Sequence, residues 1–311
     1  MAQRPLISIV TPFFNEGAGV LQFYQALTKT IDTLINFDFE IICIDDGSSD
    51  ETLSQLIACA NQDSRIIVLE LSRNFGKEAA MSAGIDIAKG DCVIPIDADL
   101  QDPPPLISIM LQEWEKGAEV VLAKRINRST DSFVKRKTAE TFYRFHNALS
   151  NLQIPENVGD FRLMDRIVVD AIKKLPERQR FMKGLFAWVG FKTITVEYVR
   201  EPRSTGETKF SGWKLWNFAI EGITSFSLVP LKVWTYVGLM GSVFAIFYAI
   251  FIIVRTWIFG IDLPGYASLL VVMLFFGSLQ LMSLGIIGEY IGRIYFESKQ
   301  RPIYLIKKQY P

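Results

Sequence analysis

The sequence has little cysteine and almost no histidine: three cysteines and one histidine in 311 residues. The cysteines, Cys43, Cys59 and Cys92, are too few and too scattered for a zinc site or a disulfide framework, and they fit a reducing compartment. A lone histidine such as His146 is more often structural than catalytic. We therefore expect the chemistry of this chain to rest on other side chains.

The chain also lacks net charge and the common nucleotide motifs. Its 33 basic and 33 acidic residues balance, which removes the strongest electrostatic reason to expect nucleic-acid binding. Neither a Walker A stretch nor a Gly-x-Gly-x-x-Gly string occurs, so P-loop and classical dinucleotide sites lack support. The first ten residues lack a long apolar segment and pass directly into a strand pattern, so no secretory signal is expected.

Two long apolar runs lie near the C-terminus. Residues 233–254 and 263–288 contain no charged side chain. Because a helix needs about 20 apolar residues to cross a bilayer, these runs predict a transmembrane hairpin. The alternative is a pair of buried helices in a soluble protein, which are usually shorter and carry some polar face.

Basic residues flank the hairpin on its outer sides. In the connection between the two runs, the only charged residues are Arg255 and Asp262. The positive-inside rule then predicts that the large N-terminal part and the tail both lie in the cytoplasm. The flanking basic residues are Lys209, Lys214, Lys232, Arg293, Lys299, Arg301, Lys307 and Lys308.

The N-terminal part alternates short apolar runs with helical patterns. Continuous apolar strands that are each followed by a helix predict an α/β fold with a mostly parallel sheet covered on both faces. Ser48 and Glu51 have the spacing of a capping box, which predicts that a helix begins at Ser48. The expected strands are residues 6–10, 39–44, 66–71, 91–96 and 120–123, and the clearest helical patterns are 17–35 and 77–88.

Polar side chains follow each expected strand. In open α/β sheets, ligands bind beyond the carboxyl ends of the strands, so these residues are expected to share one site. At the end of the fourth strand, Asp97 and Asp99 are two carboxylates separated by one small residue. Such a pair, together with substrate phosphates, suits a hard divalent cation such as Mg²⁺ or Mn²⁺. The simpler explanation for each polar residue alone is a helix cap or a turn.

Several motifs together resemble a known family. The chain is similar to the inverting GT-A glycosyltransferases of family 2, and within them to the polyprenyl-phosphate glycosyltransferases, above all the bactoprenol glucosyltransferases. Dolichyl-phosphate mannose synthases share the N-terminal two thirds. The motifs that carry the resemblance are Pro12-Phe13-Phe14-Asn15-Glu16, Asp45-Asp46-Gly47-Ser48, Asn74-Phe75-Gly76-Lys77, Asp97-Ala98-Asp99-Leu100-Gln101-Asp102-Pro103, Val158-Gly159-Asp160-Phe161-Arg162-Leu163, Arg180-Phe181-Met182-Lys183-Gly184, Arg203-Ser204-Thr205-Gly206-Glu207-Thr208-Lys209, Gly222-Ile223-Thr224-Ser225-Phe226-Ser227 and Gly288-Glu289-Tyr290-Ile291-Gly292-Arg293.

The resemblance implies roles for individual residues. Asp99 and Gln101 match the metal ligands, for Mg²⁺ or Mn²⁺. Arg125, Arg203 and Lys209 match basic residues around the diphosphate and the acceptor phosphate, and with Asp99 and Asp160 they form the expected catalytic set. The expected nucleotide-binding residues are Pro12, Phe14, Asn15, Glu16, Asp45, Asp46, Lys77, Asp97 and Ala98.

The implied reaction moves glucose from UDP-glucose to undecaprenyl phosphate with inversion at the anomeric carbon. Relatives with the same metal motif transfer mannose or formamido-arabinose, so the donor sugar stays open. The acceptor phosphate is already anionic near neutral pH, so a strong general base is not required. Asp160 matches an acidic position that has been proposed as the base in this family. The alternative is that Asp160 orients Arg162 or a sugar hydroxyl.

The expected organisation has four parts. A catalytic GT-A domain (1–210) precedes an amphipathic juxtamembrane helix (211–231), a hairpin (232–292, with spans near 233–258 and 266–291) and a cytoplasmic tail (293–311). Trp213 and Trp216 fall on one face of the expected juxtamembrane helix, which favours docking on the lipid bilayer. The alternative is an ordinary helix packed on the sheet.

Two other functions compete with this interpretation. Processive polysaccharide synthases share only the catalytic core and carry a Gln-x-x-Arg-Trp string that does not occur here. A non-enzymatic membrane scaffold or lipid carrier would have no use for a metal motif. Glycines in both spans, including Gly238 and Gly285, would permit close helix packing, so a homo-oligomer is left open.

Overall fold

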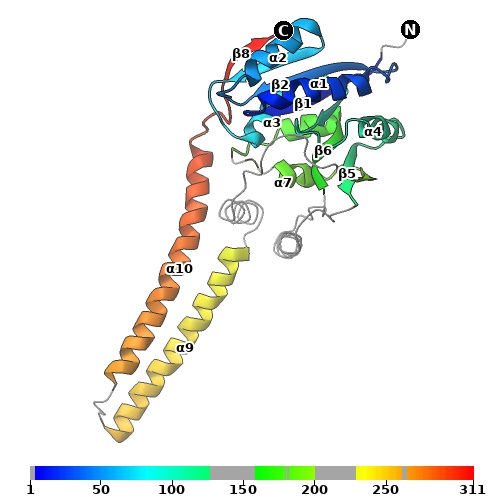
Figure 1. Ribbon diagram of the computed structural model, residues 1–311. Helices are drawn as coiled ribbons and strands as arrows, with labels where there is room; N and C mark the ends of the chain where they lie inside the picture. Colours follow the sequence, from blue (N-terminus) through cyan, green and yellow to red (C-terminus); the bar gives the residue numbers. More distant parts are fainter. Residues whose placement is uncertain (1–3, 127–157, 179, 181, 200–228, 261–264) are drawn as a thin grey trace.

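The chain folds into an α/β domain from which two long helices project (Figure 1). The computed structural model describes residues 4–126, 158–178, 180, 182–199, 229–260 and 265–311. The strands are β1 (Leu6–Phe13), β2 (Asp38–Asp45), β3 (Ile66–Leu71), β4 (Cys92–Pro95), β5 (Val120–Arg125), β6 (Val158–Asp165), β7 (Thr193–Tyr198) and β8 (Ile306–Tyr310). The helices are α1 (Gly17–Ile31), α2 (Thr52–Gln62), α3 (Lys77–Ile87), α4 (Leu106–Glu115), α6 (Arg166–Lys173), α7 (Met182–Trp188), α9 (Val229–Phe259) and α10 (Tyr266–Ser298).

One eight-stranded sheet organises the domain, in the order β7-β5-β6-β4-β1-β2-β3-β8. Strands β4, β1, β2 and β3 are parallel to one another, and β5 is parallel to β7. Strand β6 runs antiparallel to β4 and β5, and β8 runs antiparallel to β3. The five predicted strands and the mostly parallel α/β sheet are thus confirmed, and the polar segments after β1, β2, β3 and β4 meet at one edge.

Two apolar layers hold the sheet. One lies under α1, α2 and α4, where residues such as Phe23 and Leu27 recur at helical spacing against β1 and β2. The other lies under α3, α6 and α7. Phe23 packs edge-on against Phe13 with ring centroids 5.6 Å apart, and its truncation to alanine would cost about 3–5 kcal/mol. Figure 1 shows α3 and α7 on the side of the domain that faces the long helices.

The predicted capping box is wrong. Helix α2 begins at Thr52, and its N-cap residue Glu51 makes no side-chain cap hydrogen bond. The Ser48 hydroxyl instead accepts a hydrogen bond from the Asn15 N–H at 3.0 Å. Asp50 serves the helix start, because its carboxylate accepts from the Thr52 N–H at 3.0 Å. The competing partner in the β1–α1 loop therefore decides where the helix starts.

Helices α9 and α10 form the candidate hairpin. Their segments Val233–Phe259 and Val271–Ser298 are long and apolar enough to cross a membrane, and neither is buried inside the protein. The helices run side by side, and the ring of Phe276 lies 3.5 Å from where a Cβ on Gly241 would sit (Figure 1). Glu289 pairs with Arg293 one turn further along α10 at 3.3 Å. Residues 211–228 of the predicted juxtamembrane helix lie outside the described residues, as does His146, and residues 229–231 belong to α9.

Candidate functional site

The loops after β1 and β2 are joined by side-chain hydrogen bonds. Asn15, at φ 53°, accepts from the Ser49 N–H at 2.9 Å through its side-chain oxygen. The Glu16 N–H donates to the Thr52 hydroxyl at 2.9 Å, and the Gly17 N–H donates to Asp50 at 3.1 Å. Because these polar groups satisfy one another, the shape of this part of the edge is fixed before any ligand arrives.

The two carboxylates at the end of β2 have different surroundings. Both oxygens of Asp46 are occupied, by the Phe75 N–H at 2.7 Å and the Gly76 N–H at 2.9 Å. Asp46 is 2% exposed, so it organises the loop after β3. In Asp45 one oxygen accepts from the Ser48 N–H at 3.3 Å, while the other is buried and finds no hydrogen-bond partner among the described residues. A buried oxygen without a partner is costly, and a donor from an ordered water or a ligand would remove that cost.

Gly47 brings the β2 and β3 loops together. Its φ of +68° lies in the left-handed region, and a Cβ there would come within 2.5 Å of the Arg73 backbone. Only glycine fits both constraints. Among the other predicted nucleotide-binding residues, Pro12 lies in β1 opposite Ile44, Phe14 is 37% exposed just after β1, and Ala98 is partly exposed after β4.

Lys77 joins two of the predicted carboxylates. Its ammonium lies 2.7 Å from Asp97, which follows β4, and 2.7 Å from Asp160 on β6. Burial alone would raise the pKa of Asp160, but the charges of Lys77, Lys183 and Arg162 hold it well below its usual range. Asp160 is therefore ionised at neutral pH, and its second oxygen is buried with no partner among the described residues.

The predicted metal ligands lie in one tight turn. Leu100 between them adopts φ 56°, and the Gln101 N–H donates to the Asp99 carboxylate at 3.1 Å. A carboxylate and an amide supply the oxygen ligands that Mg²⁺ and Mn²⁺ prefer, so the residues fit such a cation. The part of the chain that the structure describes holds no group of three or more His, Cys, Asp or Glu suited to a metal. A cation held by Asp99 and Gln101 would therefore need further oxygen ligands from the phosphates of a bound substrate.

Arg125, at the end of β5, is held by Tyr198, which belongs to no motif, and by Asp102 of the motif after β4. Its guanidinium donates to the Tyr198 hydroxyl at 3.2 Å and lies 3.9 Å from Asp102. The Tyr198 hydroxyl in turn donates to Asp102. These contacts leave Arg125 24% exposed and aligned at the sheet edge. The other predicted basic residues, Arg203 and Lys209, lie outside the described residues.

Three further charged residues surround Asp160. The Arg162 guanidinium donates to the Gly159 carbonyl at 2.8 Å and stacks 4.1 Å from the Phe186 ring centroid. Its contact with Asp160 is to the backbone carbonyl at 3.4 Å, whereas the Asp160 carboxylate faces Lys77. Burial raises the pKa of Glu78 to about 8, and the charge of Asp160 adds to this. Arg162 and Lys183 belong to the quoted motifs, whereas only proximity in the fold reveals Glu78.

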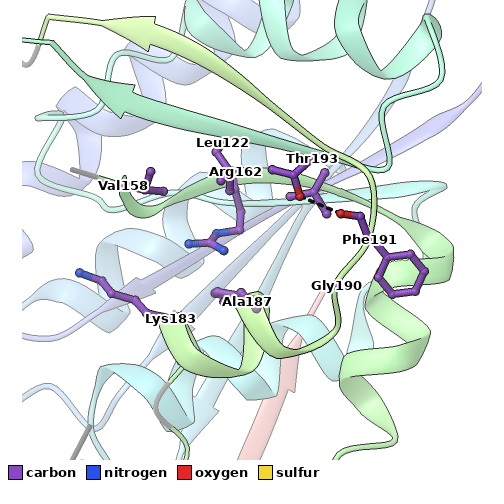
Figure 2. Close-up of a pocket in the computed structure, with 10 residues that line it drawn as sticks. Leu122, Val158, Arg162, Lys183, Ala187, Gly190, Phe191 and Thr193 are labelled. Atoms are coloured by element: carbon purple, nitrogen blue, oxygen red, sulfur yellow. Dashed lines mark hydrogen bonds between the residues drawn. The ribbon is translucent and has the colours of Figure 1, made fainter. Parts of the chain in front are cut away.

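A pocket lies beside this cluster, between β5 and β6 on one side and α7 on the other (Figure 2). Arg162 and Lys183 line it together with apolar side chains such as Leu122 and Ala187. Its volume is about 160 Å³. Sites for whole organic ligands usually measure about 300–1,000 Å³, so this pocket is too small for a nucleotide sugar. The site for a large ligand is therefore better sought at the open strand ends.

Comparisons with known proteins agree with this architecture. Residues 8–173 match the model of glycosyl transferase family 2, and residues 229–294 match that of the GtrB C-terminal hairpin. An uncharacterized glycosyltransferase of Synechocystis is 54% identical over 96% of this chain and 94% of its own. A prophage bactoprenol glucosyl transferase homolog of Escherichia coli K12 and the bactoprenol glucosyl transferase of Shigella phage SfV are each 53% identical, over 97% of this chain and 98% of theirs. A crystal structure of glucosyl-3-phosphoglycerate synthase from Mycobacterium tuberculosis with Mn²⁺, UDP and phosphoglyceric acid gives a TM-score of 0.44 at 20% identity, covering 71% of this chain and 76% of that one.

Proposed function

Because the chain belongs to glycosyltransferase family 2, we propose that it transfers glucose from UDP-glucose to undecaprenyl phosphate, with inversion at the anomeric carbon. The observation that carries this proposal is the 53% identity to bactoprenol glucosyl transferases over 97% of the chain, hairpin included. The product would be a lipid-phosphate-linked glucose for a later glycan modification such as that of O-antigen.

The proposed step needs no proton transfer. An anionic oxygen of the acceptor phosphate attacks C1 of glucose, the bond from C1 to the UDP oxygen breaks, and UDP leaves with the electron pair. A nucleophile that is already ionised gains little from a base. Asp160, kept ionised beside Lys77 at 2.7 Å, is better suited to accept a hydrogen bond from a sugar hydroxyl through its unpartnered oxygen.

The remaining residues divide the work between donor binding and charge stabilisation. Asp45 would accept a hydrogen bond from the nucleotide, within loops held by Asn15 and Asp46. Arg125 would face the phosphate charge, and the family resemblance gives Arg203 and Lys209 the same role. Mg²⁺ or Mn²⁺, bound by Asp99 and Gln101, would neutralise negative charge on the departing diphosphate.

A transfer assay tests the proposal. Full-length protein in lipid would receive undecaprenyl phosphate, Mg²⁺ or Mn²⁺ and labelled UDP-glucose, with UDP-mannose and UDP-galactose in parallel. We expect metal-dependent label in a lipid-extractable product from UDP-glucose. Asp99→Asn should lower it by about 10²–10³-fold. Glu113→Gln is the matched control. Glu113 lies on α4 and pairs with Lys116, which follows that helix, outside the strand-end site.

The outcomes separate the alternatives. Label from UDP-mannose alone would reassign the donor sugar, and a polymeric product would indicate a synthase. No lipid product from any donor, with no binding of UDP, would refute the proposed site. Equal activity of Asp99→Asn and the wild type would remove the metal from the proposal.

We also infer that the protein is a multi-pass protein of the bacterial inner membrane, with its catalytic domain and both termini in the cytoplasm. The basic flanks of the hairpin support this orientation. Strand β8 in the tail pairs with β3 of the domain, which supports placing the tail and the domain on the same side of the membrane. A cysteine placed at Gly260, between the helices, should react with an impermeant thiol reagent in intact spheroplasts, whereas one placed at Lys299 should react only after lysis.

A further inference from the structure

The last strand of the chain completes the sheet on its β3 edge. Strand β8 pairs antiparallel with β3, with Leu69 opposite Gln309, and the Ser72 N–H donates to the Leu305 carbonyl at 2.9 Å. In Figure 1 it is the red strand next to α2, far along the chain from its partner. The segment that follows the second long helix is thus part of the catalytic domain.

This strand holds one buried carboxylate of β3. Glu70 is 7% exposed, and its two oxygens are occupied by the Lys307 ammonium at 2.5 Å and the Tyr310 hydroxyl at 2.9 Å. The ammonium and the hydroxyl both come from β8. A charged pair with an added hydrogen bond fixes the Glu70 side chain and balances its charge.

Glu70 is a neighbour of the nucleotide-binding candidate Asp45. The two residues lie opposite each other in the parallel register of β2 and β3, so their side chains point to the same face of the sheet. Two carboxylates side by side repel each other and repel an anionic ligand. Lys307 supplies the opposite charge at this position.

The same segment is anchored to the domain along its length. The Glu297 carboxylate near the end of α10 accepts from the Arg178 N–H at 2.8 Å. The Tyr304 hydroxyl donates to Asp86 at 2.7 Å. A continuous set of contacts therefore runs from the hairpin to the edge that carries Asp45.

We propose that β8 is part of the donor site: Lys307 and Tyr310 hold and neutralise Glu70, and Glu70 in this state leaves Asp45 able to bind the nucleotide. Lys307, Tyr310 and Glu70 are positioning residues, since they act through Asp45. The inference rests on the proposed function, in which Asp45 binds the nucleotide. It makes donor affinity depend on residues that follow the membrane hairpin.

The test is the affinity of the full-length protein for UDP, measured by calorimetry in detergent micelles. Lys307→Met removes the ammonium that contacts Glu70 and leaves Lys308 as the nearby cation, and we expect it to weaken UDP binding about threefold to tenfold. The double variant Lys307→Met with Glu70→Gln removes both charges and should restore wild-type affinity. Lys116→Met is the matched control: this lysine is 66% exposed against 63% for Lys307 and also pairs with a glutamate, but it follows α4 and precedes β5, away from the strand ends.

Each outcome decides the inference. Weakened binding by Lys307→Met, restored by Glu70→Gln and absent in Lys116→Met, would support it. Unchanged binding by Lys307→Met would overturn it, and so would a loss that Glu70→Gln does not repair, because the strand would then act only on folding. A wild-type chain that binds no UDP would refute the proposed function itself, and the inference with it.

Discussion

The two sides of the strand-end site hold their charged groups in different ways. Beside β1 and β2, the oxygens of Asn15, Asp46 and Asp50 accept hydrogen bonds from backbone N–H groups. Beside β4 and β6, Asp97 and Asp160 face the ammonium of Lys77. Backbone donors cannot move without unfolding a loop, whereas a lysine side chain can change partners. The first side therefore provides a fixed shape, and under the proposed function the second would provide charge that is redistributed when a diphosphate binds.

The strongest test of this difference is to remove the exchangeable cation. Lys77→Met would remove the ammonium that contacts both Asp97 and Asp160, so the two carboxylates would repel each other and we expect transfer of glucose to fall about 10²-fold, chiefly in kcat. The rate with labelled UDP-glucose and undecaprenyl phosphate measures this. Lys174→Met, which alters an exposed lysine after α6, serves as the control. A Lys77→Met variant with the wild-type rate would show that the ion pairs are structural only.

The fixed side should respond in stability before it responds in rate. Asp46→Ala removes the acceptor of the Phe75 and Gly76 N–H groups, and two partly buried donors without partners should cost about 1–3 kcal/mol of unfolding free energy. Denaturant unfolding of the domain followed by tryptophan fluorescence measures the change. Glu51→Gln, at an exposed neighbouring position, should leave the midpoint unchanged. If Asp46→Ala lowers kcat but leaves the unfolding free energy unchanged, Asp46 contacts substrate. The proposed difference between the two sides of the site would then be wrong.

A pH dependence of stability is expected on the side of the site that carries Lys77. Burial raises the pKa of Glu78 to about 8, so the folded state keeps a proton that the unfolded state loses near its ordinary value of 4.5. Stability contributed by this group is therefore present at low pH and is lost as the pH rises to about 8. We expect the Tm of the wild type to decline across this window and that of Glu78→Gln to decline less. Parallel curves for the two proteins would contradict the assignment.

The sequence predicts the parts of this fold that follow from strong local patterns. Strands such as residues 66–71 are continuous apolar runs, and the structure has β3 with the same bounds. Because the carboxyl ends of parallel strands meet at one edge, the approach of Lys77 to Asp97 also follows from the order of the motifs. Asp160 joins Lys77 and Asp97 from β6. The sequence marks this segment as a motif but does not predict that it is a strand.

Other features depend on contacts between distant residues and leave no local signal. Strand β8 reads Ile-Lys-Lys-Gln-Tyr, which is short and polar, and its existence depends on the free edge of β3. The role of Tyr198 beside Arg125 depends on the parallel pairing of β5 with β7. Ser48 has the right residue type and spacing for a helix cap, but its hydroxyl accepts a hydrogen bond from the Asn15 N–H in the loop after β1. In each case tertiary structure selects among locally acceptable alternatives.

The C-terminal strand also matters for how the protein behaves when it is cut or tagged. Strand β3 reads Ile-Ile-Val-Leu-Glu-Leu, an apolar stretch whose outer backbone groups would be open to any extended chain if β8 were missing. An uncovered edge of this kind is a template for intermolecular pairing and aggregation. Strand β8 replaces it with an edge that carries two lysines, a feature that discourages further strand addition. A chain ending at residue 300 should therefore form aggregates rich in β-structure, while a tag placed after a flexible spacer should be tolerated.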